Sequence, residues 1–285
     1  MRIIQTKHAM AHRPIPLYRE RPVRRSRELS VGQSGGDMWN GKRTTRALGM
    51  ATAVGIGIAS FAGDARAQAA GSVSLGAGWL HIMPQSGSGD LFVQSVAGAP
   101  VNRALPDTGG HVATSNAFSL MAEYQFTDHV GIAFLAGTPF TSDLVGDRSF
   151  AGYGVLGQAK PLAPVLALRY HFLAADARFR PFVGLGVNYT WYVDTHITNK
   201  QFLDGSCGPG CTTRSSLSAS WNPTFEAGFN VALGKHLGLN VSAMYIPMST
   251  TLTTDATNAA GTHDVTTLHV HTNPLITHVD LVYSF

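Results

Sequence analysis

Ionisable side chains recur inside alternating apolar runs of this chain. In residues 118–126, for example, Glu123 sits on the polar side of a run whose other side is Phe, Leu, Ala, Tyr and Phe. Successive side chains of a β-strand point to opposite faces, so each such charge faces away from the apolar stripe of its own run. If the runs surround one interior, its predicted polar lining is Glu123, Arg169, Asp194, Glu226 and Asp280, with His171 and His278 beside them.

One arginine among four carboxylates suits two kinds of site, and the sequence leaves both open. A charged constriction would select solutes, whereas a salt-bridged network would fill a narrow interior, because a buried carboxylate is costly unless it is paired. Covalent catalysis is a third possibility, but the chain has no G-x-S-x-G elbow, and its Ser, His and acidic residues fall on separate runs. We therefore expect no enzymatic activity, no catalytic residue and no cofactor.

Two further groups of residues have the chemistry of cross-links or metal sites. Cys207 and Cys211 enclose Gly-Pro-Gly, and an even cysteine pair in an exported chain predicts a disulfide. A metal or redox pair is the alternative, but the sequence offers no ligand nearby. His269 and His271 share a face of a strand and follow His263. Two such histidines can chelate a metal, but solvated polar positions are the commoner use, so we assign no metal.

The elements that must position these residues are eight alternating runs, each of a length suited to a tilted strand that crosses a bilayer. They cover residues 72–83, 115–126, 130–139, 166–172, 183–194, 221–231, 237–246 and 275–285. Their connections alternate between long and short, with short turns at residues 127–129, 173–180 and 234–236. Transmembrane barrels have short periplasmic turns and long extracellular loops. The pattern predicts an all-β fold: an eight-stranded antiparallel up-and-down transmembrane barrel with both termini in the periplasm.

The faces of the runs favour a membrane barrel over a soluble one. A soluble barrel would fill its small interior with the apolar face, yet the opposite face carries Gly, Asn, Thr and the charges. Aromatic residues near the strand ends fit interfacial girdles. Some inward positions are apolar and either line a solute path or fill space: Leu80, Ile82, Leu135, Met244 and Ile246.

The first 67 residues differ in composition from the rest. Residues 38–67 have a basic start, a run of small apolar residues and an Ala-Arg-Ala cleavage site, which together predict a signal peptide. A membrane anchor is the alternative, but the apolar run is shorter than the ~20 residues that a spanning helix needs. Residues 1–37 are Arg-rich and are expected to be disordered or an upstream extension. The barrel is predicted to occupy residues 68–285.

Charge excludes a nucleic-acid-binding role for that barrel. The whole chain has a formal net charge of +4, but 12 of its 21 Lys and Arg residues and only 4 of its 17 acidic residues precede Gln68. The barrel alone is therefore near −4 and has no basic stripe to neutralise phosphates.

Several segments together resemble the OmpW family of small outer-membrane proteins. They are Ala136-Gly-Thr-Pro-Phe140, Leu168-Arg-Tyr-His-Phe172, residues 181–190, residues 239–247 and residues 279–285. The resemblance implies an outer-membrane barrel of a Gram-negative cell whose apolar inner path admits small apolar molecules and releases them sideways into the membrane. It also implies that Tyr283 and the terminal Phe285 form the signal for the barrel-assembly machinery, with periplasmic chaperones as partners. The long first and third loops, including the cysteine pair, depart from the family pattern.

Our hypothesis is a monomeric barrel, surrounded by outer-membrane lipids, that passes small apolar solutes. Exit is expected where proline weakens strand pairing, near Pro139, Pro223 or Pro247. The alternative is a surface receptor, adhesin or structural envelope protein that acts through its loops and has a closed lumen.

Overall fold

A computed structural model describes residues 68–285 of the chain. The predicted signal peptide and upstream extension lie outside the described residues. No helix within residues 68–285 has the length and apolar character needed to span a membrane.

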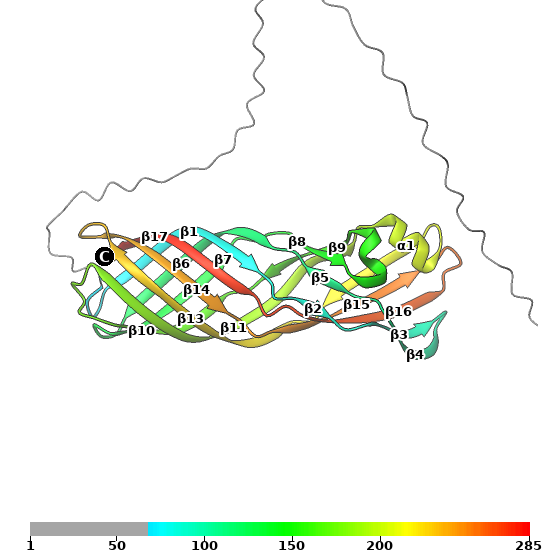
Figure 1. Ribbon diagram of the computed structural model, residues 1–285, viewed down its shortest axis with the longest axis horizontal. Helices are drawn as coiled ribbons and strands as arrows, with labels where there is room; N and C mark the ends of the chain where they lie inside the picture. The colour runs from blue at the N-terminus through cyan, green and yellow to red at the C-terminus, as the bar shows by residue number, and fades with distance from the viewer. Residues whose placement is uncertain (1–67) are drawn as a thin grey trace, which may run out of the picture. The chain divides into compact units, whose positions relative to one another are not determined.

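Eight antiparallel strands pair in a closed circle, as the sequence predicts (Figure 1). The order around the barrel is β10-β7-β6-β1-β17-β14-β13-β11, and β11 pairs again with β10 to close it. The strands are β1 (Val73–Met83), β6 (Ser115–Gln125), β7 (Val130–Gly137), β10 (Val165–His171), β11 (Phe179–Ile197), β13 (Ser220–Ala232), β14 (Leu237–Tyr245) and β17 (Leu275–Ser284). Closure pairs every strand on both sides, which the hydrocarbon core of a membrane requires.

The barrel carries its apolar side chains on the outer surface and its polar side chains inside, the reverse of a soluble domain. On β17, Val279, Leu281 and Tyr283 point outward and are exposed, whereas the alternating His278, Asp280 and Val282 are buried inside. The same alternation holds on the other strands, with Leu185 60% exposed and Trp221 72% exposed on the outer surface. Exposed apolar residues in a continuous band are stable only against lipid.

The long connections are expected as loops, but in the structure they fold into further elements, which is a correction. They comprise β2 (Gly87–Ser88), β3 (Leu91–Val96), β4 (Ala99–Leu105), β5 (Gly110–Val112), β8 (Ser142–Gly146), η1 (Arg148–Tyr153), β9 (Val155–Leu162), α1 (Lys200–Cys207), β12 (Thr212–Leu217), β15 (Ser249–Thr257) and β16 (His263–His271). These elements lie at the end of the barrel opposite the C-terminus, as Figure 1 shows. We call them the extension.

The extension is held to the barrel by ladders and by side chains. The β9, β8 and β5 strands continue the barrel sheet from β11, whereas β12, β15, β16, β3 and β4 form a second sheet. Ser86 and Ser88 join the two, because their hydroxyls accept hydrogen bonds from the backbone of Val112 and Gly110. Arg148 adds bonds to Asp90 and to the Ser88 carbonyl. Within the extension, the apolar residues Leu252, Leu268 and Val270 form a small core of their own.

The lipid-facing band makes a prediction about stability. Leu168 is central on β10, points outward and is 55% exposed. Leu168→Arg should lower the free energy of unfolding by about 2–4 kcal/mol, because the charge must enter the middle of the bilayer. Urea unfolding of the protein in lipid vesicles measures this. Val193→Arg is the control, since this exposed residue lies beyond the Trp191 girdle in the extension half of β11, and it should change stability by no more than about 0.5 kcal/mol. Equal effects of the two substitutions would contradict the assignment of the band.

Candidate functional site: an apolar cavity above a buried ion network

Three of the charges named from the sequence meet inside the barrel. Arg169 donates two hydrogen bonds to Glu226, from Nε to Oε2 at 2.9 Å and from Nη2 to Oε1 at 2.7 Å. Its Nη1 donates to Oε2 of Glu123 at 2.8 Å. The other oxygen of Glu123 lies 2.6 Å from His171 Nε2 and accepts a bond from Gln125 at 2.8 Å. We call these five residues the ion network.

The ion network fills the barrel because glycines on neighbouring strands make room for it. A Cβ at Gly184 would lie 3.1 Å from Oε2 of Glu226, and one at Gly131 would lie 2.9 Å from Oε1 of Glu123. Phe182 packs under the guanidinium, with the Cζ of Arg169 4.5 Å from its ring centroid. The side chains of Arg169 and His171 are fully buried. An eight-stranded barrel is only just wide enough for side chains, so this layer closes the lumen.

Below the ion network, Arg180 fills the end of the barrel that carries the short turns. Its Nη1 donates to Oε1 of Gln68 at 2.9 Å, and its Nη2 donates to the carbonyl of Asp128. Polar side chains therefore fill most of the lower half of the barrel, and the larger apolar space lies in the upper half.

Asp280 and Asp194 lie apart from the ion network. Asp280 is buried and faces the lumen, but neither carboxylate oxygen has a hydrogen-bond partner within residues 68–285. The prediction that Asp194 lines the lumen is wrong: Asp194 is exposed on the part of β11 that pairs with β9 of the extension. Its φ of 54° lies in a break of the β11–β9 register, which turns its side chain outward. There it accepts a 2.6 Å hydrogen bond from Lys160, and this cation lowers the pKa of Asp194 below its usual value.

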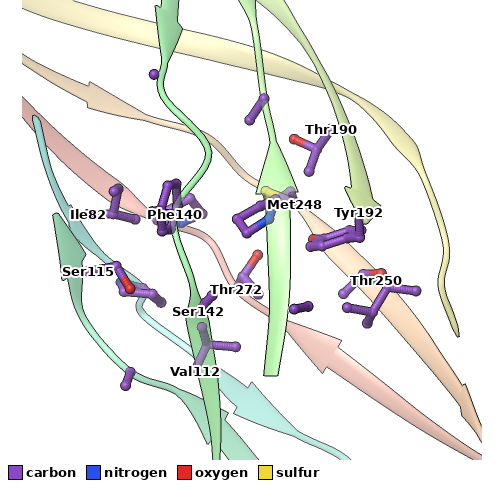
Figure 2. Close-up of a pocket in the computed structure, with 18 of the residues that line it drawn as sticks. Ile82, Val112, Ser115, Phe140, Ser142, Thr190, Tyr192, Met248, Thr250 and Thr272 are labelled. Carbon is purple, nitrogen blue, oxygen red and sulfur yellow. The ribbon is translucent and has the colours of Figure 1, made fainter. Parts of the chain in front are cut away.

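Above the ion network lies a cavity with mostly apolar walls (Figure 2). Its volume is about 160 Å³. The apolar inward residues named from the sequence all lie in its wall: Leu80, Ile82, Leu135, Met244 and Ile246. On β17 the lining stops at His278, and on β10 it includes Val165 but not Arg169, so the cavity occupies the half of the barrel nearer the extension.

The upper wall of the cavity comes from residues that the sequence did not single out. Val112, Phe140, Tyr192 and Met248 surround it in Figure 2, together with threonines 250 and 272. Several of them belong to the extension, including Leu144, Leu252 and Val270. The abundance of Thr in residues 249–257 and of Thr and Val in residues 263–271 was a usable strand signal there, because β-branched residues favour strands.

The barrel wall beside the cavity has a gap in its backbone pairing near Pro139. The β6–β7 ladder stops at Ser119 and Gly137, and the β7–β10 ladder stops at Leu135 and Val165. Residues 138–141 therefore belong to neither ladder, and proline has no N–H to extend one. Ser115 and Phe140, on either side of this gap, both line the cavity.

The other two prolines named from the sequence face a second gap. The β13–β14 ladder begins at Phe225 and Tyr245, and its register would place Pro223 opposite Pro247. None of residues 220–224 lines the cavity, however. Of the two gaps, the one at Pro139 is flanked on both sides by cavity-lining residues.

The remaining candidate groups lie away from the cavity. Cys207 and Cys211 form a disulfide at the end of α1. His269 and His271 lie exposed on β16, with ring centroids 4.8 Å apart. The described part of the chain holds no group of three or more His, Cys, Asp or Glu residues placed to bind a metal ion. Tyr283 and Phe285 are exposed outside the barrel at the short-turn end, with ring centroids 4.9 Å apart.

Comparison with known proteins decides the family. Residues 69–285 match the OmpW family. The chain belongs to the OmpW family of outer-membrane barrels. It is 30% identical to outer membrane protein W of Vibrio cholerae over 155 residues, which cover 54% of this chain and 69% of that protein. The long connections and the extension are therefore extracellular, and the short turns periplasmic.

Two other proteins show what the barrel is similar to. The crystal structure of the outer membrane protein OprG from Pseudomonas aeruginosa matches with a TM-score of 0.66 at 25% identity, over 78% of this chain and 99% of that one. The dibenzothiophene metabolism operon protein PahQ of Pseudomonas aeruginosa is 24% identical over 183 residues, which cover 64% of this chain and 77% of that protein.

The ion network predicts how the barrel responds to loss of its cation. Arg169→Met leaves Glu123 and Glu226 buried without their partner, so it should lower the free energy of unfolding by about 3–5 kcal/mol. Urea unfolding in lipid vesicles measures this. Adding Glu123→Gln and Glu226→Gln removes the uncompensated charges, and this triple variant should recover most of the loss. An Arg169→Met variant as stable as the wild type would show that the ion network does not stabilise the folded barrel.

Proposed function

We propose that this OmpW-family barrel passes small apolar molecules through the lipopolysaccharide leaflet and releases them sideways into the membrane. The observation that carries the proposal is the apolar cavity, which lies directly above a closed layer of charges. Solutes enter from the extracellular extension, occupy the cavity and leave between strands. Neither a cofactor nor covalent chemistry takes part.

The closed floor favours a sideways exit over passage to the periplasm. An apolar solute that continued downward would have to displace the Arg169 pairs, and leaving a buried charge unpaired is strongly unfavourable. We expect the gap near Ser115 to lie at the surface of the outer leaflet, because the outward aromatic residues Trp79 and Phe118 pair on adjacent strands just below it and fit an interfacial girdle. Leaving through the wall costs less than crossing the floor.

The gap at Pro139 is the exit that the geometry favours. Residues 138–141 are bound to β6 by few contacts: a backbone bond from Thr138 to Phe118 at 2.9 Å and two bonds that involve hydroxyl groups. Moving this segment therefore breaks fewer bonds than opening a complete ladder. The solute class is supported by the name of PahQ, which belongs to an operon for dibenzothiophene metabolism.

The N-terminal signal peptide and the C-terminal aromatic residues point to a route of export and assembly. We propose that the chain is exported by its N-terminal signal peptide and delivered by periplasmic chaperones. Tyr283 and Phe285, which are accessible at the periplasmic end, then present it to the barrel-assembly machinery. The eight barrel strands close on one another and leave no backbone edge within the barrel for a second copy to cover, which supports a monomer, although the extension has edge strands at β4, β5 and β12.

A cross-link across the exit tests the proposal. If the register of β6 and β7 is extended beyond its last pair, Ser119 and Gly137, Ala117 lies opposite Pro139, so Ala117→Cys with Pro139→Cys should form a disulfide that holds the gap shut. Cys207→Ser and Cys211→Ser remove the native disulfide from the background. Uptake of radiolabelled toluene by intact Gram-negative cells is measured. Cells with the wild-type protein should take it up several-fold faster than cells without it, and the cross-linked variant should fall to that background.

Two controls make the result specific. Reduction of the bond should restore uptake. The paired cysteines Ala227→Cys and Ala243→Cys, which lie opposite each other within the β13–β14 ladder, should leave uptake unchanged. Full uptake through the cross-linked Ala117 and Pro139 variant would rule out this exit, and no uptake above background by the wild type would rule out the transport function.

A further inference from the structure

We propose that apolar solutes enter the cavity between β11 and β12, through the wall of the extension. The parts of these strands that lie side by side, residues 191–197 and 212–217, are called the seam. The inference rests on the proposed function, because it names the entrance of the same solute path. It follows from the strand pairing of the extension and from the places where the cavity wall is exposed.

No ladder joins the two strands of the seam. β11 pairs with β13 as far as Thr190 and Ser220, and beyond that point it pairs with β9 on its other edge. β12 pairs with β15 alone. Within residues 68–285, no backbone hydrogen bond crosses the seam. A solute can therefore pass between these strands without breaking a ladder.

The other junction between the two sheets of the extension is held by hydrogen bonds. The backbone N–H groups of Gly110 and Val112 donate to the hydroxyls of Ser88 and Ser86. Arg148 reaches across the same junction and donates to the Ser88 carbonyl at 3.1 Å. Opening this side would break these bonds, so the seam is the easier of the two junctions to part.

Among the described residues that line the cavity, three are exposed, and they mark two openings. Gly137 and Ala163 adjoin the Pro139 gap, where the β7–β10 ladder has ended. The third, His196, belongs to the seam, and its side chain is 48% exposed. The cavity therefore reaches the surface at the seam as well as at the gap.

Both strands of the seam contribute to the cavity wall. Ile197 on β11 and Leu217 on β12 line the cavity and are half-buried. In Figure 2, Tyr192, on β11, lies across the cavity from Ser115, which flanks the Pro139 gap. A solute that enters at the seam and leaves at the gap therefore crosses the cavity.

The outer surroundings of the seam suit an entrance rather than an exit into lipid. Asp194 and Lys160 form an exposed ion pair beside β11, and Arg214 is exposed on β12. Such charges are unfavourable against acyl chains, so the seam faces the extracellular side of the membrane. The Pro139 gap, in contrast, adjoins the exposed outward Phe118, whose carbonyl accepts the bond from Thr138.

One continuous segment frames the seam. The chain runs along β11, through α1 and the disulfide between Cys207 and Cys211, and back along β12. The last β11–β13 pair, Thr190 and Ser220, closes the end nearer the barrel. The long third loop, which carries the cysteine pair, is therefore the frame of the entrance.

A bridge across the seam tests the inference. His196→Cys and Leu217→Cys are introduced together with Cys207→Ser and Cys211→Ser, and a bis-methanethiosulfonate with a short flexible spacer links the two new thiols. Mass spectrometry verifies the link. Toluene uptake by intact cells should fall to that of cells without the protein, and reduction of the link should restore it. In His196→Cys alone, benzyl methanethiosulfonate attaches a bulky group at the opening and should also lower uptake.

Two controls separate the entrance from other effects of the bridge. Val96→Cys and Ala99→Cys, exposed register partners in the β3–β4 hairpin, should keep full uptake after the same linkage. Equilibrium dialysis of toluene against the protein in nanodiscs, corrected with protein-free nanodiscs, reports on the cavity itself. The seam bridge should leave this affinity unchanged, because the cavity still fills through the Pro139 gap.

The outcomes distinguish the entrance from the function beneath it. Full uptake through the bridged seam would place the entrance elsewhere and leave transport intact. Loss of toluene binding together with uptake would make His196 and Leu217 part of the binding site, and would overturn their role as an entrance. If the wild-type protein gave no uptake above background, the proposed function would fail together with this inference.

Discussion

The pairing of one buried guanidinium with two buried carboxylates is the constraint on which the rest of the barrel depends. Arg169 joins Glu123 on β6 to Glu226 on β13, so the bond pattern spans the lumen between strands that are not neighbours in the wall. Such a group is stable only when every partner is present. It therefore closes the interior of the barrel at one level.

That closure divides the interior into two halves with different chemistry. The periplasmic half is filled mostly by polar side chains, among them Arg180, whose Nη1 and Nη2 are hydrogen-bonded. The extracellular half is apolar, and its walls continue into the folded extension, where Leu252 and Val270 contribute to the lining. A solute in the upper half thus has an apolar surface on most sides, and the pairing gap at residues 138–141 lies in the wall of the cavity. The proposed path follows from this division.

The sequence predicted the barrel well because the lipid enforces a strict alternation. Every lipid-facing residue must be apolar, so the inward set, with Glu123, Arg169 and Glu226, is identified by exclusion. Beyond the lipid, the alternation no longer predicts which side chains face inward. On β11, the register break after Val193 turns Asp194 outward, whereas Thr195 and Ile197 line the cavity instead. No local pattern marks that change. Nor could the sequence show that Arg169 reaches two strands while Asp280 reaches no partner among the described residues, because such contacts depend on the stagger of the closed sheet.

The proposed path requires that apolar solutes occupy the extracellular half of the barrel and do not cross the Arg169 layer. Crystals of the protein soaked with 4-bromotoluene can show this by anomalous diffraction, because bromine can be located against the protein. We expect bromine peaks beside the cavity residues Leu80 and Met244, and in the gap between Ser115 and Phe140. Bromine peaks on the periplasmic side of Arg169, or none in the cavity, would rule out the proposed path.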